Sequence, residues 1–247
     1  MVESNRSLTQ TIVQDLGLAI VCGTYSAGNP FPIEAELCKH YQVSRSILRE
    51  AVKMLTSKGL LNARPRQGTW VEPEQSWNLL DPDVLRWLLE RKFSLNLLAE
   101  FTEVRLAIEP QAAALAAERG SEAQVAQIQR AIERMEAAEV GDDDPLLADI
   151  AFHVAVLEAS GNRFYARLQD LIDTALRISI RLTNQFKGVA VASVADHRKV
   201  LDGILARDPE RARAASCALI SEAMELIQKV QSESGKTGKG ESEKTGP

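Results

Sequence analysis

The sequence predicts a mainly α protein in which a small N-terminal part with two short strands precedes an all-helical bundle. Short helical and strand patterns, broken by Gly and Pro, occupy residues 8–72, and no strand pattern follows. Few aromatic residues and many Ala, Leu, Glu and Arg also favour helices. A chain of 247 residues is long enough for each part to bury its own core.

The composition is that of a globular protein in a reducing compartment. The three cysteines, Cys22, Cys38 and Cys217, are odd in number and show no paired spacing, which argues against a disulfide framework. The N-terminal "MVESNRSLTQ" lacks an apolar core, and no apolar run approaches the roughly 20 residues that a membrane span needs. We therefore expect a cytoplasmic protein.

The first 72 residues combine helices with a hairpin. Apolar residues at helical spacing predict a helix over 8–22, and "EAELCKHY" predicts a short one over 34–41. Ser44 is a good N-cap for the helix predicted over 45–58. Residues 60–73 then suggest two short strands joined by a basic turn. Two short helices, the second basic on its outer face, followed by a basic hairpin are typical of a winged helix-turn-helix.

The charge distribution supports a DNA-binding role for this part. The whole chain has a net charge of −5, yet residues 38–68 hold seven basic side chains and one acidic side chain, Glu50. Such local asymmetry forms an electrostatic footprint for DNA even on an acidic chain. The charge alone is equally consistent with a helix face that is exposed to solvent and binds no DNA.

The basic face of the 45–58 helix supplies the candidate DNA contacts. Arginine forks onto guanine O6 and N7, and small hydroxyls fit phosphate or base. We therefore expect Arg45 and Arg49 to contact bases and Ser44 and Ser46 to contact phosphate or base, while Lys53 meets phosphate or solvent. Ile47 could contact a thymine methyl group or belong to the core. At the wing tip, where Gly lets the backbone approach DNA closely, the candidates are Arg66, Gln67, Gly68 and Thr69.

The rest of the chain is organised by helix caps. Asp-Pro pairs, Ser and Asn caps, and closing Gly residues delimit successive helices after a Pro- and Asp-punctuated linker. The last 16 residues contain no aliphatic or aromatic side chain and are expected to be disordered. The predicted helices are 83–91, 95–119, 122–139, 145–160, 162 to about 186, 194–206 and 209–231. The predicted domains are a DNA-binding domain (1–72), a linker (73–83), a six- or seven-helix ligand-binding and dimerisation domain (84–231) and a tail (232–247).

Four ionisable residues lie on the apolar stripes of these helices: Arg105, Asp149, His153 and His197. Several ionisable groups facing one core are costly unless they serve a site, so we expect them to line a polar ligand pocket. A buried Arg105 needs an anion. That anion is either Glu109, one helical turn later, or the carboxylate of a bound effector.

The sequence also allows two other functions, an enzyme and a purely structural dimerisation bundle. Asp149 and His153 could form a catalytic dyad, but the chain has no nucleophile elbow, P-loop, GxGxxG motif after a strand or HExxH motif, so no catalytic residue is expected. A purely structural dimerisation bundle would scatter its inward polar residues, whereas these converge.

The N-terminal part resembles the GntR family of bacterial repressors. The resemblance rests on "FPIEAELCKHYQVSRSILREAVKMLTSKGLL" and "RQGTWV". The chain has Ile33-Glu34-Ala35 where the family usually has Ser-Glu-Arg, and Ile47 where it usually has Pro. An operator sequence therefore cannot be carried over from other members.

The helical part resembles the effector domain of the FadR subfamily. The segments "EVRLAIEPQAAALAA", "ADIAFHVAVLEASGN" and "DHRKVLDGILARD" carry this resemblance. It implies a ligand-responsive transcriptional repressor that binds a two-fold operator as a homodimer. The segment "SWNLLDPDVLRWLLE" resembles repressors of galactonate-type sugar-acid catabolism, which implies an aldonate as effector.

A metal is the remaining candidate cofactor. Asp149 and His153, four residues apart, and His197 offer O, N and N donors that suit Zn, Ni or Mn. The resemblance implies a fourth ligand, a His 22 residues after the one matching His197, but this chain has Leu219 there. We therefore expect incomplete metal occupancy, in a sensor of a sugar acid or of another organic acid. Without metal, the same three side chains would hydrogen-bond the sugar acid directly.

Overall fold

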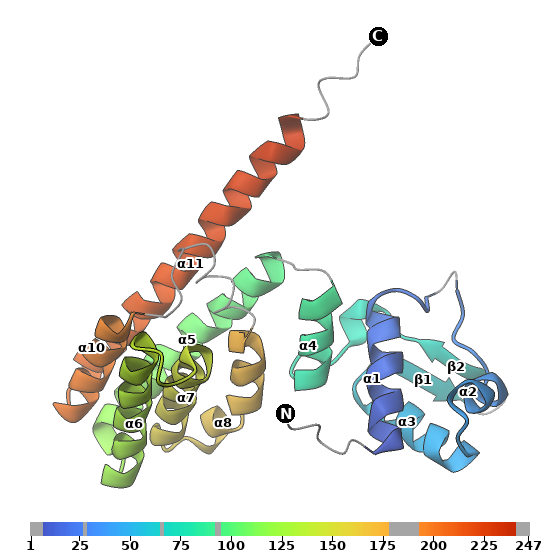
Figure 1. Cartoon of the computed structure of the whole chain (residues 1–247), viewed down its shortest axis with the longest axis horizontal. Helices are drawn as coiled ribbons and strands as arrows, with labels where there is room; N and C mark the ends of the chain where they lie inside the picture. The colour runs from blue at the N-terminus through green and yellow to red at the C-terminus, as the bar shows by residue number, and fades with distance from the viewer. Residues whose placement is uncertain (1–6, 27–28, 65–66, 92–94, 178–192, 241–247) are drawn as a thin grey trace. The chain divides into compact units, whose positions relative to one another are not determined.

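The computed structural model of the chain describes residues 7–26, 29–64, 67–91, 95–177 and 193–240 (Figure 1). The side chains of Glu90 and of residues 233–240 are not part of that description. Contacts divide the chain into two compact units, Met1–Phe93 and Ser94–Pro247. Among the described residues, no helix is both long enough and apolar enough to cross a membrane.

The first unit has the expected winged helix-turn-helix architecture. Strands β1 and β2 form an antiparallel pair in which Leu61 lies opposite Val71. The Ser44 hydroxyl accepts a hydrogen bond from the Ile47 N–H at 3.5 Å and so begins the third helix, as predicted. The elements are α1 (Leu8–Val21), α2 (Glu34–Tyr41), α3 (Arg45–Ser57), β1 (Leu61–Arg64), β2 (Gly68–Val71), the 3-10 helix η1 (Glu74–Ser76) and α4 (Pro82–Arg91).

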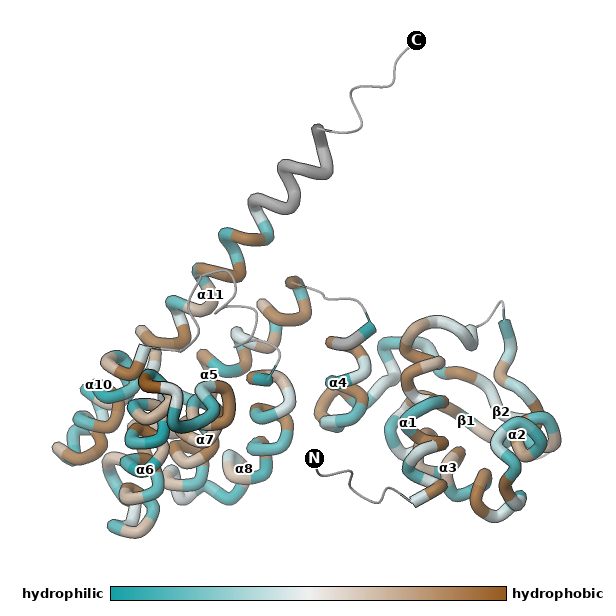
Figure 2. Tube along the Cα trace, viewed as in Figure 1, coloured by the Kyte–Doolittle hydropathy of each residue, from teal (hydrophilic) through white to brown (hydrophobic). Residues whose placement is uncertain are grey.

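Helix α3 is amphipathic, and its apolar side forms the core of this unit with α1. Leu48 and Leu55 of α3 are fully buried, as are Leu16 and Ile20 of α1, and the two helices pack together. Figure 2 shows the alternation of apolar and polar residues along the helices that such packing requires. Burying one face of α3 leaves its basic face exposed to solvent.

Helix α4 packs with the first unit, which differs from the expected boundary at residue 84. The Trp87 ring lies so close to α1 that a Cβ atom on Gly17 would come within 2.4 Å of it. Trp87 Nε1 also donates to Gln14 Oε1 at 2.9 Å. The absence of a side chain at Gly17 therefore leaves room for the Trp87 ring. Burial of this large ring stabilises the packing of α4 against α1.

The expected linker 73–83 is held in place rather than free. The Lys58 ammonium, at the end of α3, lies 2.8 Å from Asp81 Oδ2 and 2.9 Å from Asp83 Oδ2. Burial by itself would raise the pKa of Asp83, but the hydrogen bond and charge of Lys58 lower that pKa overall. A backbone hydrogen bond also ties this segment to the end of α3, because the Asn78 N–H donates to the Lys58 carbonyl at 3.0 Å. Pro and Asp residues here build turns and caps, not a flexible connection.

The second unit is all-helical, as predicted. Helix α5 packs against α7 and α11, α6 packs against α7, and α10 contacts α5, α6 and α11. The Ser121–Gln124 capping box is present at the start of α6. The interior is therefore shared by side chains from α5, α6, α7, α10 and α11. The bounds are α5 (Leu95–Arg119), α6 (Glu122–Glu139), α7 (Pro145–Ala159), α8 (Arg163–Ala166), α10 (Val194–Leu205) and α11 (Pro209–Gly240).

Two expected helix bounds differ from the structure. The helix expected over 162–186 is interrupted after α8, because the Arg167 and Leu168 N–H groups bond to carbonyls three residues back. The backbone is helical again over 169–177, and residues 178–186 lie outside the described part. Helix α11 continues to Gly240, past the expected end at residue 231, since adding residues to a formed helix is much easier than starting one. Residues 232–240, which were expected to be disordered, are helical, and the expected disorder of 241–247 concerns residues outside the description.

Candidate functional site

The basic face of α3 is the first candidate site. Arg45, Arg49 and Lys53 are exposed, with side-chain exposures of 74%, 69% and 78%. The Ser44 hydroxyl caps the helix and lies 2.8 Å from the Ser46 hydroxyl, so the two hydroxyls meet at the exposed N-terminus of α3. Free N–H groups at a helix N-terminus together with cationic side chains favour an anion such as phosphate. Ile47 is half-buried, between its two expected roles.

The described part of the wing presents Gln67, Gly68 and Thr69. Gln67 and Gly68 are exposed and Thr69 is half-buried. Gly68 has φ +86, a backbone conformation that other residues rarely adopt, and no atom lies within 4 Å of the position a Cβ would take. The wing backbone is therefore open to close approach. Arg66, the fourth expected wing contact, lies outside the described residues.

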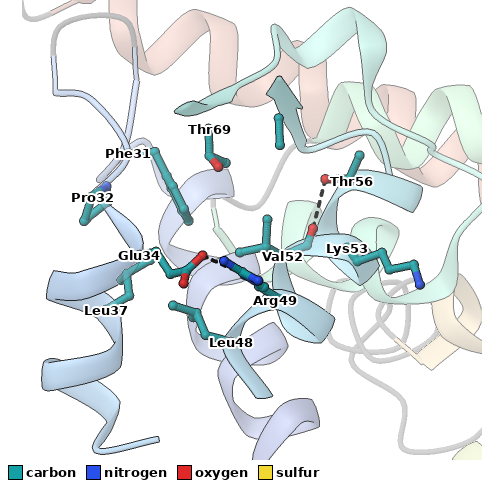
Figure 3. A pocket seen from close by; sticks show the side chains of 11 residues that line it. Phe31, Pro32, Glu34, Leu37, Leu48, Arg49, Val52, Lys53, Thr56 and Thr69 are labelled. Carbon is teal, nitrogen blue, oxygen red and sulfur yellow. Dashed lines mark hydrogen bonds and ion pairs between the residues drawn. The ribbon is translucent and has the colours of Figure 1, made fainter. Parts of the chain in front are cut away.

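A groove of about 360 Å³ lies beside Arg49, and the sequence did not predict it (Figure 3). At its edge, Arg49 Nε donates a hydrogen bond to Glu34 Oε2 at 3.0 Å. That hydrogen bond raises the pKa of Arg49, so its charge is permanent. An acidic side chain thus sits within a basic surface. The lining residues are Phe31, Pro32, Glu34, Leu37, Leu48, Arg49, Val52, Lys53, Thr56, Ala63 and Thr69.

The second candidate site is a buried cluster in the helical unit. Arg105 of α5, Asp149 and His153 of α7 and His197 of α10 are each at most 5% exposed. The structure brings all four together, as their positions on separate apolar stripes predicted. Buried ionisable groups are costly unless they are paired, so their partners show what the cluster is built for.

Arg105 is paired with Glu109, one of the two anions considered for it. Arg105 Nε donates to Glu109 Oε1 at 2.6 Å, and Nη2 lies 3.4 Å from Oε2. Burial would raise the pKa of Glu109, but the charge of Arg105, together with His153, lowers it to about 2. Glu109 is therefore a carboxylate, and it satisfies one edge of the guanidinium.

Glu109 also contacts His153, which sequence analysis missed. His153 Nδ1 lies 2.6 Å from Glu109 Oε2. Burial would lower the pKa of His153, but the nearby charge of Glu109 raises it overall. The helical spacing between Arg105 and Glu109 was visible in the sequence. The relative rotation of α5 and α7, which brings Glu109 to His153, was not.

Both histidines are oriented by what their Nδ1 atoms contact. His197 Nδ1 lies 2.7 Å from the Ser193 carbonyl, and His153 Nδ1 faces the Glu109 carboxylate. These oxygens can only accept hydrogen bonds, so each Nδ1 must carry the proton. In a neutral imidazole, each Nε2 then presents a lone pair. This is how metal-binding histidines are commonly oriented by the groups behind them.

The two Nε2 atoms converge on one carboxylate oxygen. Asp149 Oδ1 lies 3.3 Å from His153 Nε2 and 3.1 Å from His197 Nε2. Despite these distances, Asp149 Oδ1 and His197 Nε2 are buried atoms without an aligned hydrogen bond among the described residues. Burial would raise the pKa of Asp149, yet the adjacent imidazoles lower it overall. One donor atom from each of the three residues lies within 4.8 Å of the others. When both imidazoles are neutral, these three donor atoms form an electron-rich point that fits a divalent cation.

The position of the expected fourth ligand holds no donor. Leu219 is half-buried on α11. Of its polar neighbours, Ser216 is buried and Cys217 is exposed. The described residues therefore provide the three donors Asp149, His153 and His197.

Comparison with known families gives two matches that cover both units. Residues 8–71 match the model described as "Bacterial regulatory proteins, gntR family". Residues 100–222 match the model of the FCD domain. The two matched regions contain the α3 surface and the buried cluster, respectively.

Individual relatives align along most of the chain. The galactonate operon transcriptional repressor of Escherichia coli K12 is 33% identical over 223 residues, covering 90% of this chain and 97% of that protein. The transcriptional regulator LutR of Bacillus subtilis is 28% identical, covering 83% of this chain and 94% of its own. A solved structure of Lar, which controls expression of the Listeria monocytogenes agr system, has a TM-score of 0.56 at 17% identity. It covers 92% of this chain and 99% of its own, and supports the fold alone.

Proposed function

This chain belongs to the GntR family of bacterial regulatory proteins and carries an FCD domain, and we propose that it is a repressor of small-carboxylate catabolism. It is a DNA-binding transcriptional regulator, and its relatives are regulators rather than enzymes. We propose further that it acts in the cytoplasm as a homodimer on a two-fold operator, and that a sugar acid, an aldonate such as galactonate, alters its affinity for that operator.

The observation that carries this proposal is the convergence of Asp149, His153 and His197 on one buried point. Two of the converging atoms, Asp149 Oδ1 and His197 Nε2, have no aligned hydrogen bond among the described residues. A bundle that served only for dimerisation would gain nothing from such groups, because buried polar atoms without partners destabilise the fold. A ligand that satisfies them recovers that free energy, so ligand binding and the arrangement of α5, α7 and α10 are coupled.

We propose that these three residues can hold a divalent transition metal such as Zn, Ni or Mn. The Nε2 lone pairs and the Asp149 carboxylate form an O, N, N donor set with the orientation that metal ligands require. A bound metal would supply a positive charge that attracts a carboxylate or hydroxyl oxygen of the effector. With Leu219 in place of a fourth donor, the proposed occupancy is incomplete. In the metal-free protein, the same three side chains would hydrogen-bond the effector.

The effector class is inferred from a relative and from Arg105. The galactonate operon repressor, named for a sugar-acid operon, aligns over 90% of this chain. Arg105 uses Nε and Nη2 toward Glu109, and no contact of Nη1 is recorded among the described residues. Nη1 therefore remains to bind an effector carboxylate beside the histidines. The proposed effector site comprises Arg105, Asp149, His153 and His197.

The DNA contacts of the proposal are those expected from the sequence. Arg45 and Arg49 would contact bases, and their exposure on α3 supports this role. Lys53 would contact phosphate, Ser44 and Ser46 phosphate or base, and the wing residues the DNA backbone. The wing residues are Arg66, Gln67, Gly68 and Thr69.

Operator selection followed by an effector screen tests the proposed function. The wild-type protein is first used to select an operator from random DNA. The affinity for that operator is then measured with a panel of aldonates, other hydroxy acids and neutral sugars, each with and without Zn²⁺. We expect an aldonate to change operator affinity by about tenfold or more, as is usual for allosteric coupling.

The outcomes separate the alternatives. Response to a non-sugar organic acid only in the presence of metal would favour a metal-dependent sensor of another acid. If no acid changes the operator affinity or the melting temperature, with or without metal, the helical unit would be a purely structural bundle. That result would contradict the proposal.

A further inference from the structure

A carboxylate lies in the surface that is expected to face DNA. Glu34 is the first residue of α2, and its side chain is 36% exposed. Its Oε2 accepts the hydrogen bond from Arg49 Nε at 3.0 Å, and its Oε1 lies 3.7 Å from Arg45 Nε. One carboxylate thus faces both arginines on the basic face of α3, across the turn between α2 and α3. Figure 3 shows its hydrogen bond with Arg49.

The charge of Glu34 works against binding to DNA in general. Binding to the phosphate backbone depends on releasing counterions, and a negative charge on the bound face opposes it regardless of sequence. The Glu34–Arg49 ion pair is also exposed, and exposed pairs contribute little to folding stability. Neither general DNA affinity nor stability therefore accounts for the pair, which leaves a role in sequence readout.

The geometry of the contact suits such a role. Glu34 engages Arg49 through Nε, and no partner of its terminal nitrogens Nη1 and Nη2 is recorded among the described residues. A bidentate contact with guanine O6 and N7 needs two N–H donors in one plane, which the two terminal nitrogens supply. The hydrogen bond from Nε to Glu34 restricts the long Arg49 side chain, which otherwise samples many rotamers. The fork is then oriented before DNA arrives.

We propose that Glu34 is a specificity-determining positioning residue, which holds the Arg49 fork for a guanine in the operator. It lowers affinity for unrelated DNA through its charge and raises affinity for the operator through Arg49. Both effects increase the ratio of specific to non-specific affinity. The inference rests on the base contact of Arg49 within the proposed function.

Glu36 provides a matched control on the same helix. Glu34 and Glu36 both lie in the first turn of α2, so each interacts with the same helix dipole and carries the same charge. Glu36 is exposed, and no side-chain partner of Glu36 is recorded among the described residues. Glu34→Gln and Glu36→Gln therefore remove equal charge, but only Glu34→Gln removes the contact with Arg49.

The experiment measures Kd for the selected operator and for an unrelated duplex at one salt concentration. The full-length proteins are the wild type, Glu34→Gln and Glu36→Gln, with melting curves to show that each is folded. For Glu36→Gln, we expect both affinities to be unchanged or to rise together, so the ratio stays constant. For Glu34→Gln, we expect unrelated DNA to bind as well or better and the operator to bind more weakly. The ratio is expected to fall about five- to tenfold, on the scale of one typical hydrogen bond.

The Arg49→Ala background shows whether the effect acts through Arg49. There, Glu34→Gln is expected to leave the specificity ratio unchanged, because no fork remains to be positioned. An unchanged or higher ratio for Glu34→Gln in the wild-type background would overturn the inference. Glu34 would then only mask the charge of Arg49 or repel DNA of any sequence. A fall in the ratio that persists with Arg49→Ala would also overturn it.

These outcomes are distinguishable from failure of the proposed function. If the wild type selects no operator, or if Arg49→Ala leaves the specificity ratio intact, the assigned DNA contact fails and the inference fails with it. If Arg49→Ala lowers the ratio and Glu34→Gln does not, only the role of Glu34 is overturned.

Discussion

His197 Nε2 lies 3.1 Å from Asp149 Oδ1, and both atoms are buried without an aligned hydrogen bond among the described residues. The opposite ring nitrogen of His197 is committed to the Ser193 carbonyl at 2.7 Å. The lone pair on Nε2 and the carboxylate oxygen therefore face each other, which is unfavourable unless a cation or a proton lies between them.

Adding the missing donor is expected to strengthen metal binding. Leu219 occupies the position where the family resemblance implies a fourth ligand, so Leu219→His is expected to add an imidazole to the three donors Asp149, His153 and His197. Elemental analysis after exhaustive chelation and metal reloading is expected to show substoichiometric metal in the wild type and more in Leu219→His. A fourth protein ligand would complete the tetrahedral coordination that closed Zn sites have. Leu219→Gln, which is polar but a poor Zn ligand, is the control.

Full stoichiometric metal in the wild type would contradict the expectation of incomplete occupancy. An equal metal content in Leu219→His and Leu219→Gln would contradict the placement of residue 219 at the site.

Glu109→Gln is expected to destabilise the helical unit strongly. Glu109 accepts from Arg105 and faces His153 Nδ1, so its loss leaves a buried guanidinium without its anion. Removing one partner of a buried pair costs about 3–5 kcal/mol. Urea denaturation measures the free energy of unfolding, and Glu103→Gln, an exposed site on the same helix, is the control. A loss no larger than that of the control would show that Arg105 and His153 are satisfied without Glu109.

Lys53→Ala and Arg49→Ala are expected to affect DNA binding in different ways. Lys53→Ala removes an exposed cation expected at phosphate, so it is expected to weaken all duplexes alike and to reduce the salt slope by about 0.9. Arg49→Ala is expected to weaken the operator by roughly 1–3 kcal/mol and to relax selection at one base position. Titrations of operator and unrelated duplex at several salt concentrations distinguish the two. Equal losses on both duplexes for Arg49→Ala would contradict base contact by Arg49.

A fragment comparison tests the boundary between the units. A 1–93 fragment retains α4, with Trp87 against Gly17, whereas a 1–83 fragment exposes the apolar face of α1 that α4 covers. We expect the longer fragment to melt cooperatively at a higher temperature, since burying a tryptophan contributes about 3–5 kcal/mol. Gly17→Leu in the longer fragment is expected to remove that advantage by displacing the ring. Identical melting of the two fragments would place α4 outside the folded unit.

The sequence predicted features that depend on local spacing. The Ser44 cap and the exposed basic face of α3 depend only on the spacing of residues within that helix. The approach of His153 to Asp149, four residues earlier, depends in the same way on the spacing within α7. The convergence of His197 was predicted because apolar stripes on separate helices must face one core.

Individual side-chain contacts that depend on the exact rotation or approach of two elements were not predicted. The Glu109–His153 contact requires the relative rotation of α5 and α7, which no pattern within either helix encodes. The Glu34–Arg49 contact depends in the same way on the turn between α2 and α3. The 73–83 segment was expected to be a linker because Pro and Asp also mark loops. Only the contacts of Lys58 and Trp87 show that it is fixed.

The measurement that tests the central claim most directly is the effector response of the Asp149→Ala/His197→Ala double mutant. Operator affinity is measured with and without the most effective aldonate for the wild type, the double mutant and Glu158→Gln, an exposed control on α7. The account predicts that all three proteins bind the operator equally without effector, and that only the double mutant fails to respond to the aldonate. An aldonate response of wild-type size in the double mutant would contradict the buried cluster as the effector site.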